Sequence, residues 1–119
     1  MTATRLPAEY VNPDLTAEED FADVLGARAA FAAYTAEPPQ PLPPRTLPQD
    51  MTSDQLFFIA LAQNLCGEPG RQVGRLLAET EVHTPPRARV NAMMSLLPEF
   101  AATFGCTADA HIHPKSCEF

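Results

Sequence analysis

The sequence has few basic residues: only 8 of its 119 residues are lysine or arginine, against 15 aspartates and glutamates, and the formal net charge is −7. The basic residues occur singly and form no stripe. We therefore expect no binding to nucleic acid or to an anionic membrane surface. The longest apolar runs, 29–33 and 56–61, are far too short to cross a bilayer, so we expect no transmembrane segment in this chain. Residues 1–7 lack the apolar stretch of a signal peptide, so we expect a secretion signal either upstream in a longer precursor or not at all.

Cysteine is also scarce and odd in number. The three cysteines are Cys66, Cys106 and Cys117, so pairing within the chain must leave at least one thiol over. Two interpretations stay open on this count alone. The thiols are reduced in a cytosolic protein, or their partner cysteines lie on polypeptide outside this sequence. A chain of 119 residues forms one small domain at most.

The first predicted helix covers residues 17–35. Thr16 and Glu19 have the spacing of a capping box, and the apolar residues behind them recur at helical spacing. The helix must end before the proline-rich run at 38–44, because proline cannot continue it. We expect an extended connector over residues 37–50; a ligand for a proline-reading domain is the functional alternative.

A second capping box, from Thr52 to Gln55, predicts a helix that stops at Gly67. Its predicted buried stripe consists of Leu56, Ile59, Ala60 and Gln63, with Phe57, Leu61 and Leu65 beside it. Apolar residues nearly encircle such a helix. It therefore needs more surrounding protein than this short chain offers.

Three shorter helices complete the prediction. One ends near Thr80, another begins after Pro85-Pro86, and a last one or two turns carry Phe100 and Phe104 and close at Gly105 as a C-terminal cap. No run alternates long enough to predict a strand. The fold class is therefore mainly α, with an irregular tail over 106–119 tied down by its cysteines.

Glu19 and Asp23 are four residues apart on the first predicted helix, so both carboxylates project from one face and one metal could contact both. The alternative is structural: Glu19 is also the third helical position of the predicted capping box, where a carboxylate favours the helix dipole, and Asp23 is simply solvated.

His83 lies in a loop before Pro85-Pro86, and Arg89 follows at the start of a helix. Such a loop can aim an imidazole and a guanidinium at one point, which is the pairing needed to hold a peptide carbonyl and its developing oxyanion. Ordinary surface residues at a helix start are the alternative.

Cys106, His111, His113 and Cys117 carry ligand types that suit zinc. Their spacing fits a structural zinc site poorly, because such sites take their cysteines and histidines as close pairs. A zinc module in the tail is the less favoured interpretation of these residues.

Four blocks of the sequence, taken in order, resemble the zinc metallopeptidases of the neprilysin and endothelin-converting-enzyme family. The blocks are Glu19-Asp20-Phe21-Ala22-Asp23, Gln55-Leu56-Phe57-Phe58 with Ala62-Gln63 and Cys66, Val82-His83-Thr84-Pro85 with Arg89-Val90, and Glu99-Phe100 with Phe104-Gly105-Cys106 and Pro114 to Cys117. They are similar to that family's Glu-Asn-x-Ala-Asp helix, its buried Gln-Leu-Phe-Phe helix, its Val-His-Ser-Pro substrate loop and its C-terminal tail.

The resemblance implies a role for each matched residue. Glu19 is the third ligand of a catalytic Zn²⁺, and Asp23 orients a zinc-binding histidine. His83 stabilises the oxyanion of the tetrahedral intermediate, and Arg89 binds a substrate carbonyl. The family's other two zinc ligands and its general base lie on a His-Glu-x-x-His helix, which this sequence does not contain.

The resemblance also implies that Cys66, Cys106 and Cys117 form disulfides with cysteines that precede this chain. It assigns residues 16–119 to the helical C-terminal part of a thermolysin-like catalytic domain and leaves residues 1–15 unassigned. The implied protein is a metalloendopeptidase that cleaves small peptides, either secreted or at the extracellular face of the plasma membrane. Its partners are a peptide substrate and the remainder of the parent peptidase.

Several positions depart from the family pattern: Glu18 and Asp20 stand where the family has glycine and asparagine, Leu65 replaces a tryptophan, and the sequence ends in Cys117-Glu118-Phe119. An added negative charge beside a metal ligand changes the local electrostatics. A non-catalytic, peptidase-derived module that acts by binding is therefore the alternative function.

Overall fold

The computed structural model describes residues 11–37, 50–67 and 70–107. These ranges contain five helices and no strand, which confirms the mainly α prediction. The helices are α1 (Pro13–Ala36), α2 (Ser53–Leu65), α3 (Arg71–Thr80), α4 (Pro86–Ser95) and α5 (Pro98–Phe104). Most of the predicted connector and of the predicted cysteine-tied tail lies outside the described residues.

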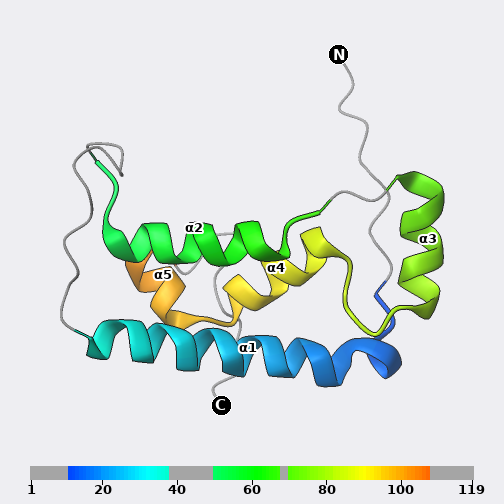
Figure 1. The fold of residues 1–119 in the computed structure, drawn as a ribbon, viewed down its shortest axis with the longest axis horizontal. Coiled ribbons are helices and arrows are strands. Elements are labelled where there is room, and N and C mark those ends of the chain that lie inside the picture. Colours follow the sequence, from blue (N-terminus) through cyan, green and yellow to red (C-terminus); the bar gives the residue numbers. More distant parts are fainter. Residues whose placement is uncertain (1–10, 38–49, 68–69, 108–119) are drawn as a thin grey trace.

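The two longest helices, α1 and α2, run in opposite directions along two sides of the molecule, and α4 and α5 lie between them (Figure 1). Helix α3 stands across the end where α1 begins (Figure 1). The loop from α3 to α4 therefore passes close to the N-terminal half of α1.

Helix α1 begins earlier than the sequence indicated. Asn12 is the N-cap: its side-chain oxygen accepts a 3.1 Å hydrogen bond from the backbone N–H of Asp14, and Pro13 occupies the first helical position. The predicted capping box at Thr16 is wrong. Thr16 lies inside the helix, is buried, and donates its hydroxyl to the carbonyl of Asn12. Glu19 is consequently free of the capping role that competed with a functional one.

The second capping box is confirmed. The backbone N–H of Gln55 donates to the Thr52 hydroxyl at 3.2 Å, and the backbone N–H of Thr52 donates to the Gln55 side chain at 3.0 Å. The predicted buried stripe of α2 is partly wrong, because Ala60 and Gln63 are exposed and the fully buried residue is Phe58. The core lies on one side of α2 only, so the helix turns one face inward and leaves the others partly open.

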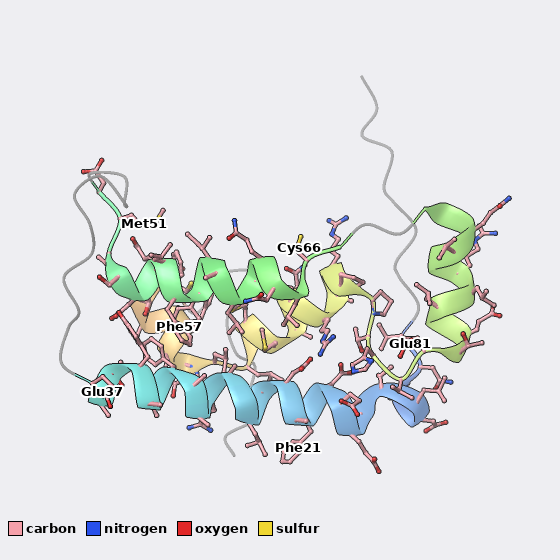
Figure 2. All side chains as sticks on the ribbon, in the orientation of Figure 1. Phe21, Glu37, Met51, Phe57, Cys66 and Glu81 are labelled. Carbon is pink, nitrogen blue, oxygen red and sulfur yellow. The ribbon has the colours of Figure 1, made fainter. Side chains whose placement is uncertain are left out.

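The hydrophobic core joins four of the helices. Its buried residues come from α1, α2, α4 and the residue that precedes α5, and Phe100 of α5 packs against them: Val24, Ala27, Phe58, Met93, Met94 and Leu97. Phe58 is 1% exposed and stacks on Phe31 of α1 with ring centroids 4.9 Å apart, while Phe100 of α5 meets it edge-on at 5.5 Å. Figure 2 shows the neighbouring Phe57 pointing from α2 toward α1.

The starts and ends of the shorter helices lie close to the positions that the sequence predicted. Helix α3 ends at Thr80, α4 begins at Pro86, and α5 closes at Gly105, whose φ of 62° is the left-handed conformation that glycine adopts without strain.

Apolar side chains remain exposed outside the core. Val73 and Leu76 of α3 are 55% and 61% exposed, and Phe21 and Leu25 of α1 are 48% and 43% exposed. Figure 2 shows Phe21 projecting from the side of α1 that faces away from the other helices. In the part of the chain that the structure describes, no helix is long and apolar enough to cross a membrane.

Candidate functional site

Three acidic residues of α1 each meet one residue of the segment that follows α3. Glu19 faces His83, Asp20 faces Thr84, and Asp23 faces Arg89. We call these six residues the acidic junction. The sequence separation of 64 to 66 residues between the hydrogen-bonded partners shows that tertiary folding, not local structure, creates it.

The Glu19–His83 contact is the most open part of the junction. The Nε2 atom of His83 lies 3.5 Å from a carboxylate oxygen of Glu19, and the two side chains are 41% and 46% exposed. Both groups are therefore accessible to a ligand that approaches from solvent.

His83 is also held from its other ring nitrogen. Its Nδ1 lies 3.0 Å from Oε1 of Glu81, and the backbone N–H of Val82 donates to the same oxygen at 3.0 Å. The hydrogen bond from His83, followed by that from Val82, lowers the pKa of the Glu81 carboxyl. Glu81 therefore fixes the orientation of the imidazole ring of His83, and the Nε2 atom of that ring faces Glu19.

Thr84 anchors the loop to α1. Its side chain is almost fully buried, and its hydroxyl donates a 2.7 Å hydrogen bond to Oδ2 of Asp20. A buried hydroxyl needs such a partner, because an unpaired one loses its hydration without compensation. This bond links the residue after His83 to the residue after Glu19.

Arg89 and Asp23 form a two-pronged ion pair. Nε and Nη2 of Arg89 donate to Oδ2 and Oδ1 of Asp23 at 2.5 and 2.7 Å, and the side chains are only 20% and 17% exposed. The bond to Asp23 raises the pKa of Arg89, with smaller contributions from the charges of Asp20 and Glu19. The guanidinium therefore stays charged and fixed in direction.

Local sequence explains why the loop reaches the junction. Helix α3 ends with Glu81 as its C-cap, whose N–H donates to the Leu77 carbonyl. After three loop residues come two prolines, and Pro86 starts α4 because its fixed φ suits the first helical position. The Arg89 N–H bonds back to the Pro85 carbonyl, which places the guanidinium one turn into α4.

The structure thus brings together Glu19, Asp23, His83 and Arg89, which are far apart in sequence. It also brings in Glu81 and Thr84, which the sequence reasoning did not single out as functional. The signal for Glu81 was its position two residues before a loop histidine, a spacing that allows the carboxylate to reach the ring. No sequence signal identified the partner of Thr84, because the partner lies on another helix.

Two of the three cysteines lie in the described residues, and neither is part of the acidic junction. Cys66 caps the C-terminal end of α2 and is exposed (Figure 2), and Cys106 follows α5; both thiols are free. Cys117, His111 and His113 lie outside the described residues, so the disulfides implied by the resemblance and the alternative zinc module stay predictions.

The acidic junction contains one side chain of a type that could bind a metal ion from its open side. Glu19 offers a half-exposed carboxylate, an oxygen ligand that zinc accepts. Among the described ranges, no group of three or more His, Cys, Asp or Glu residues is arranged to hold a metal ion. The residues fit zinc only if the remaining ligands come from other polypeptide.

Comparison with known proteins identifies the family. The profile of Peptidase family M13 matches residues 2–118. Neprilysin-1 of Caenorhabditis elegans is 39% identical in an alignment of 112 residues that covers 90% of this chain and 15% of that protein. Membrane metallo-endopeptidase-like 1 of Homo sapiens is 37% identical over 108 residues, or 90% of this chain and 14% of the relative.

Endothelin-converting enzyme-like 1 of Homo sapiens is 37% identical over 107 residues, which are 89% of this chain and 14% of the relative. The chain therefore spans about one seventh of the length of these curated relatives. No solved structure matches it significantly. The match over nearly the whole chain, together with the gathering of the four motif residues, shows that the chain belongs to peptidase family M13 and corresponds to a C-terminal segment of it.

Proposed function

We propose that this chain supplies one zinc ligand and the substrate-binding side chains of a zinc metalloendopeptidase that hydrolyses small extracellular peptides. The parent protein would be secreted or lie at the extracellular face of the plasma membrane. The observation that carries the proposal is the acidic junction, where Glu19, Asp23, His83 and Arg89 meet in a segment of the M13 family.

Glu19 would bind Zn²⁺ through its exposed carboxylate. Zinc polarises a peptide carbonyl and lowers the pKa of a bound water, which is the chemistry that peptide hydrolysis needs. Asp23 would orient a zinc-binding histidine of the parent. A carboxylate has about four lone-pair positions, so Asp23 can accept such a bond in addition to the two from Arg89.

As the imidazolium, which carries a proton on each ring nitrogen, His83 would donate from Nδ1 to Glu81 and from Nε2 to the oxyanion that forms on the substrate carbonyl. Glu81 supports this role because it holds Nδ1 at 3.0 Å and so fixes the ring plane. Preorganised donors are effective because they need no reorientation when charge develops.

Arg89 would hold a substrate carbonyl. A guanidinium carries five N–H donors, and the pair with Asp23 uses those of Nε and Nη2 that point toward α1. The ion pair fixes the orientation of the planar guanidinium, and so also that of its remaining N–H donors. Donors held in a fixed orientation suit the positioning of a peptide backbone.

The isolated chain would be inactive, because one carboxylate cannot hold catalytic zinc and the sequence contains no His-Glu-x-x-His motif. The remainder of the parent peptidase is accordingly the proposed protein partner. The exposed apolar residues of α1 and α3 support a partner that covers these faces.

A chimera tests the proposal. Residues 2–118 would replace the matching segment of C. elegans neprilysin-1, which supplies the rest of a peptidase. We expect hydrolysis of a fluorogenic peptide by the chimera and none by the 119-residue chain. Glu19→Gln should reduce kcat/KM by at least about 100-fold with loss of bound zinc, and Asp23→Asn by roughly 10- to 100-fold.

Glu18→Gln is the matched control, since Glu18 neighbours Glu19 in sequence but is exposed and outside the junction. A folded, secreted chimera whose activity and zinc content are the same in the Glu19→Gln and Glu18→Gln variants would exclude Glu19 as a ligand. The non-catalytic alternative would then be favoured.

A further inference from the structure

The loop between α3 and α4, residues 81–85, has little packing around His83. A mostly apolar cavity of about 220 Å³ lies between α3 and this loop, and its lining includes Leu77, His83 and Pro85. The side chain of His83 is also 41% exposed. Packing alone therefore does not fix where His83 lies, because the space beside it contains no atoms that resist a displacement.

The contacts of His83 itself supply only part of the restraint. Glu81 holds the ring at Nδ1, but Glu81 lies two residues away in the same segment, so this contact does not tie the loop to α1. The Nε2 atom lies 3.5 Å from Glu19, which is longer than an ordinary hydrogen bond, and both side chains are nearly half exposed. Such an open contact contributes little to holding the loop.

Thr84 ties the loop to α1. Of the hydrogen bonds that the structure describes for residues 81–85, only the one from the Thr84 hydroxyl to Asp20 reaches α1. It measures 2.7 Å, and the donor residue is 4% exposed. A carboxylate acceptor makes such a bond short and strong. Because Asp20 follows Glu19 and Thr84 follows His83, the bond lies one residue from each member of the Glu19–His83 pair.

We propose that Thr84 and Asp20 are positioning residues, whose hydrogen bond holds His83 where it can donate to the oxyanion beside Glu19. This rests on the proposed function for the roles of His83 and Glu19. A donor stabilises an oxyanion only where it already lies at hydrogen-bond distance, and a displacement of about 1 Å costs about 100-fold in rate. Loss of the bond should therefore lower kcat, because this donor acts mainly on the transition state.

The neprilysin-1 chimera tests this through its kinetic constants. Thr84→Val removes the hydroxyl and keeps the shape, so kcat should fall by roughly 10- to 100-fold while KM changes by less than about 2-fold. Thr84→Ser restores the donor and should recover most of the loss. Asp20→Ala removes the same bond from its less buried partner, which keeps the test open where Thr84→Val does not fold. The double variant should be no worse than either single one, because both changes remove one bond.

Thr16→Val is the matched control. Thr16 is 3% exposed, as deeply buried as Thr84, and its hydroxyl also donates, to the Asn12 carbonyl. Its loss of stability should be similar, but kcat should stay within about 2-fold of the unsubstituted chimera, because Thr16 lies outside the acidic junction. An equal fall of kcat in Thr16→Val and Thr84→Val, an unchanged kcat in Thr84→Val, or an effect confined to KM would overturn the proposal.

Nuclear magnetic resonance of the 119-residue chain gives a measurement without zinc or substrate. A nuclear Overhauser effect between the His83 ring protons and the Glu19 side chain should be present in the unsubstituted chain and in Thr84→Ser, and lost in Thr84→Val. The effect between His83 and Glu81 should remain in all three, because that contact lies within one segment. If the Glu19 effect persists in Thr84→Val, the bond does not position His83. An inactive chimera together with loss of the Glu19 effect would count against the proposed function and still support the positioning of His83 by Thr84.

Discussion

The two ends of this molecule are held together by different physical forces. At one end, an aromatic cluster joins α1, α2 and α5: Phe31, Tyr34, Phe57, Phe58, Phe100 and Phe104. At the other end, the acidic junction joins α1 to the loop before α4 and to α4 itself. Figure 1 shows α5 near the C-terminal half of α1 and the loop between α3 and α4 near its N-terminal half. The centre of the aromatic cluster is dry, with Phe58 1% exposed, whereas the junction leaves Glu19 and His83 nearly half exposed.

The difference indicates where stability and chemistry lie. Burial of aromatic surface is non-directional and stabilises the fold over a wide range of pH. Charged and hydrogen-bonded pairs contribute less net stability but fix the direction of each donor and acceptor. We therefore expect substitutions in the cluster to change stability most, and substitutions in the junction to change the geometry of the site with smaller losses.

The largest stability effect is expected for Phe58→Ala. This residue is 1% exposed and meets Phe31, Phe57 and Phe100, so its removal leaves a cavity in the core. The free energy of unfolding should fall by about 3–5 kcal/mol, measured by urea denaturation followed by circular dichroism. Leu25→Ala, at a 43% exposed position of α1, should cost under about 1 kcal/mol. A similar loss in both variants would contradict a core centred on Phe58.

A smaller loss is expected when the ion pair of the junction is broken. Arg89→Ala leaves the largely buried Asp23 without its partner, and the free energy of unfolding should fall by about 1–3 kcal/mol in the same assay. Arg89→Lys keeps the charge but loses the fork of two parallel bonds. It should recover only part of the loss. Full recovery by lysine would show that charge alone, and not the two-pronged geometry, holds this end.

The bond between Thr84 and Asp20 should contribute about 1 kcal/mol, seen as the loss of unfolding free energy in Thr84→Val, which removes the hydroxyl and keeps the shape. Thr80→Val is the control. Its hydroxyl bonds to a backbone carbonyl at an exposed position, so its change should stay within about 0.5 kcal/mol. If the two variants lose equal stability, the loop is not anchored through Thr84.

The smallest effect is a change in titration. The pKa of Glu81 should lie below the ordinary glutamate value and should rise toward it in His83→Ala, as measured from side-chain ¹³C shifts in a pH titration. Because the folded-state pKa is lowered, the contact stabilises the fold above the unfolded-state pKa and is lost as the pH falls through the folded-state pKa. Glu79→Gln is a control that leaves this titration unchanged, since Glu79 lies on the exposed part of α3. An unshifted Glu81 in the wild-type chain would contradict the contact with His83.

The sequence predicted the helices well because their signals are local. The Thr52–Gln55 capping box, the start of α4 at its proline pair and the glycine cap of α5 each depend on residues a few positions apart. The start of α1 was mispredicted for a related reason. Thr16 has the capping pattern, but the helix starts upstream at Asn12-Pro13. Thr16 therefore lies inside the helix, where it is buried and its hydroxyl bonds to the Asn12 carbonyl.

The candidate site was identified only in part from sequence. The matched motifs gave Glu19, Asp23, His83 and Arg89, and the structure brings these residues into one junction. The direct ion pair between Asp23 and Arg89 was not predicted. A sequence motif indicates how a residue acts on a metal or substrate, but it does not indicate which residues of two separate motifs contact each other. The same limit applies to Asp20 with Thr84 and to the cavity beside Leu77.

By itself, the sequence determined the helical class, most helix ends and the membership of a peptidase family, because each follows from short-range patterns in a fixed order. The tertiary structure alone decided which face of α2 is buried, which acid of α1 meets which residue of the loop, and where an apolar cavity lies. Those features depend on how helices far apart in sequence pack against one another, and periodicity on a single helix does not specify its partners.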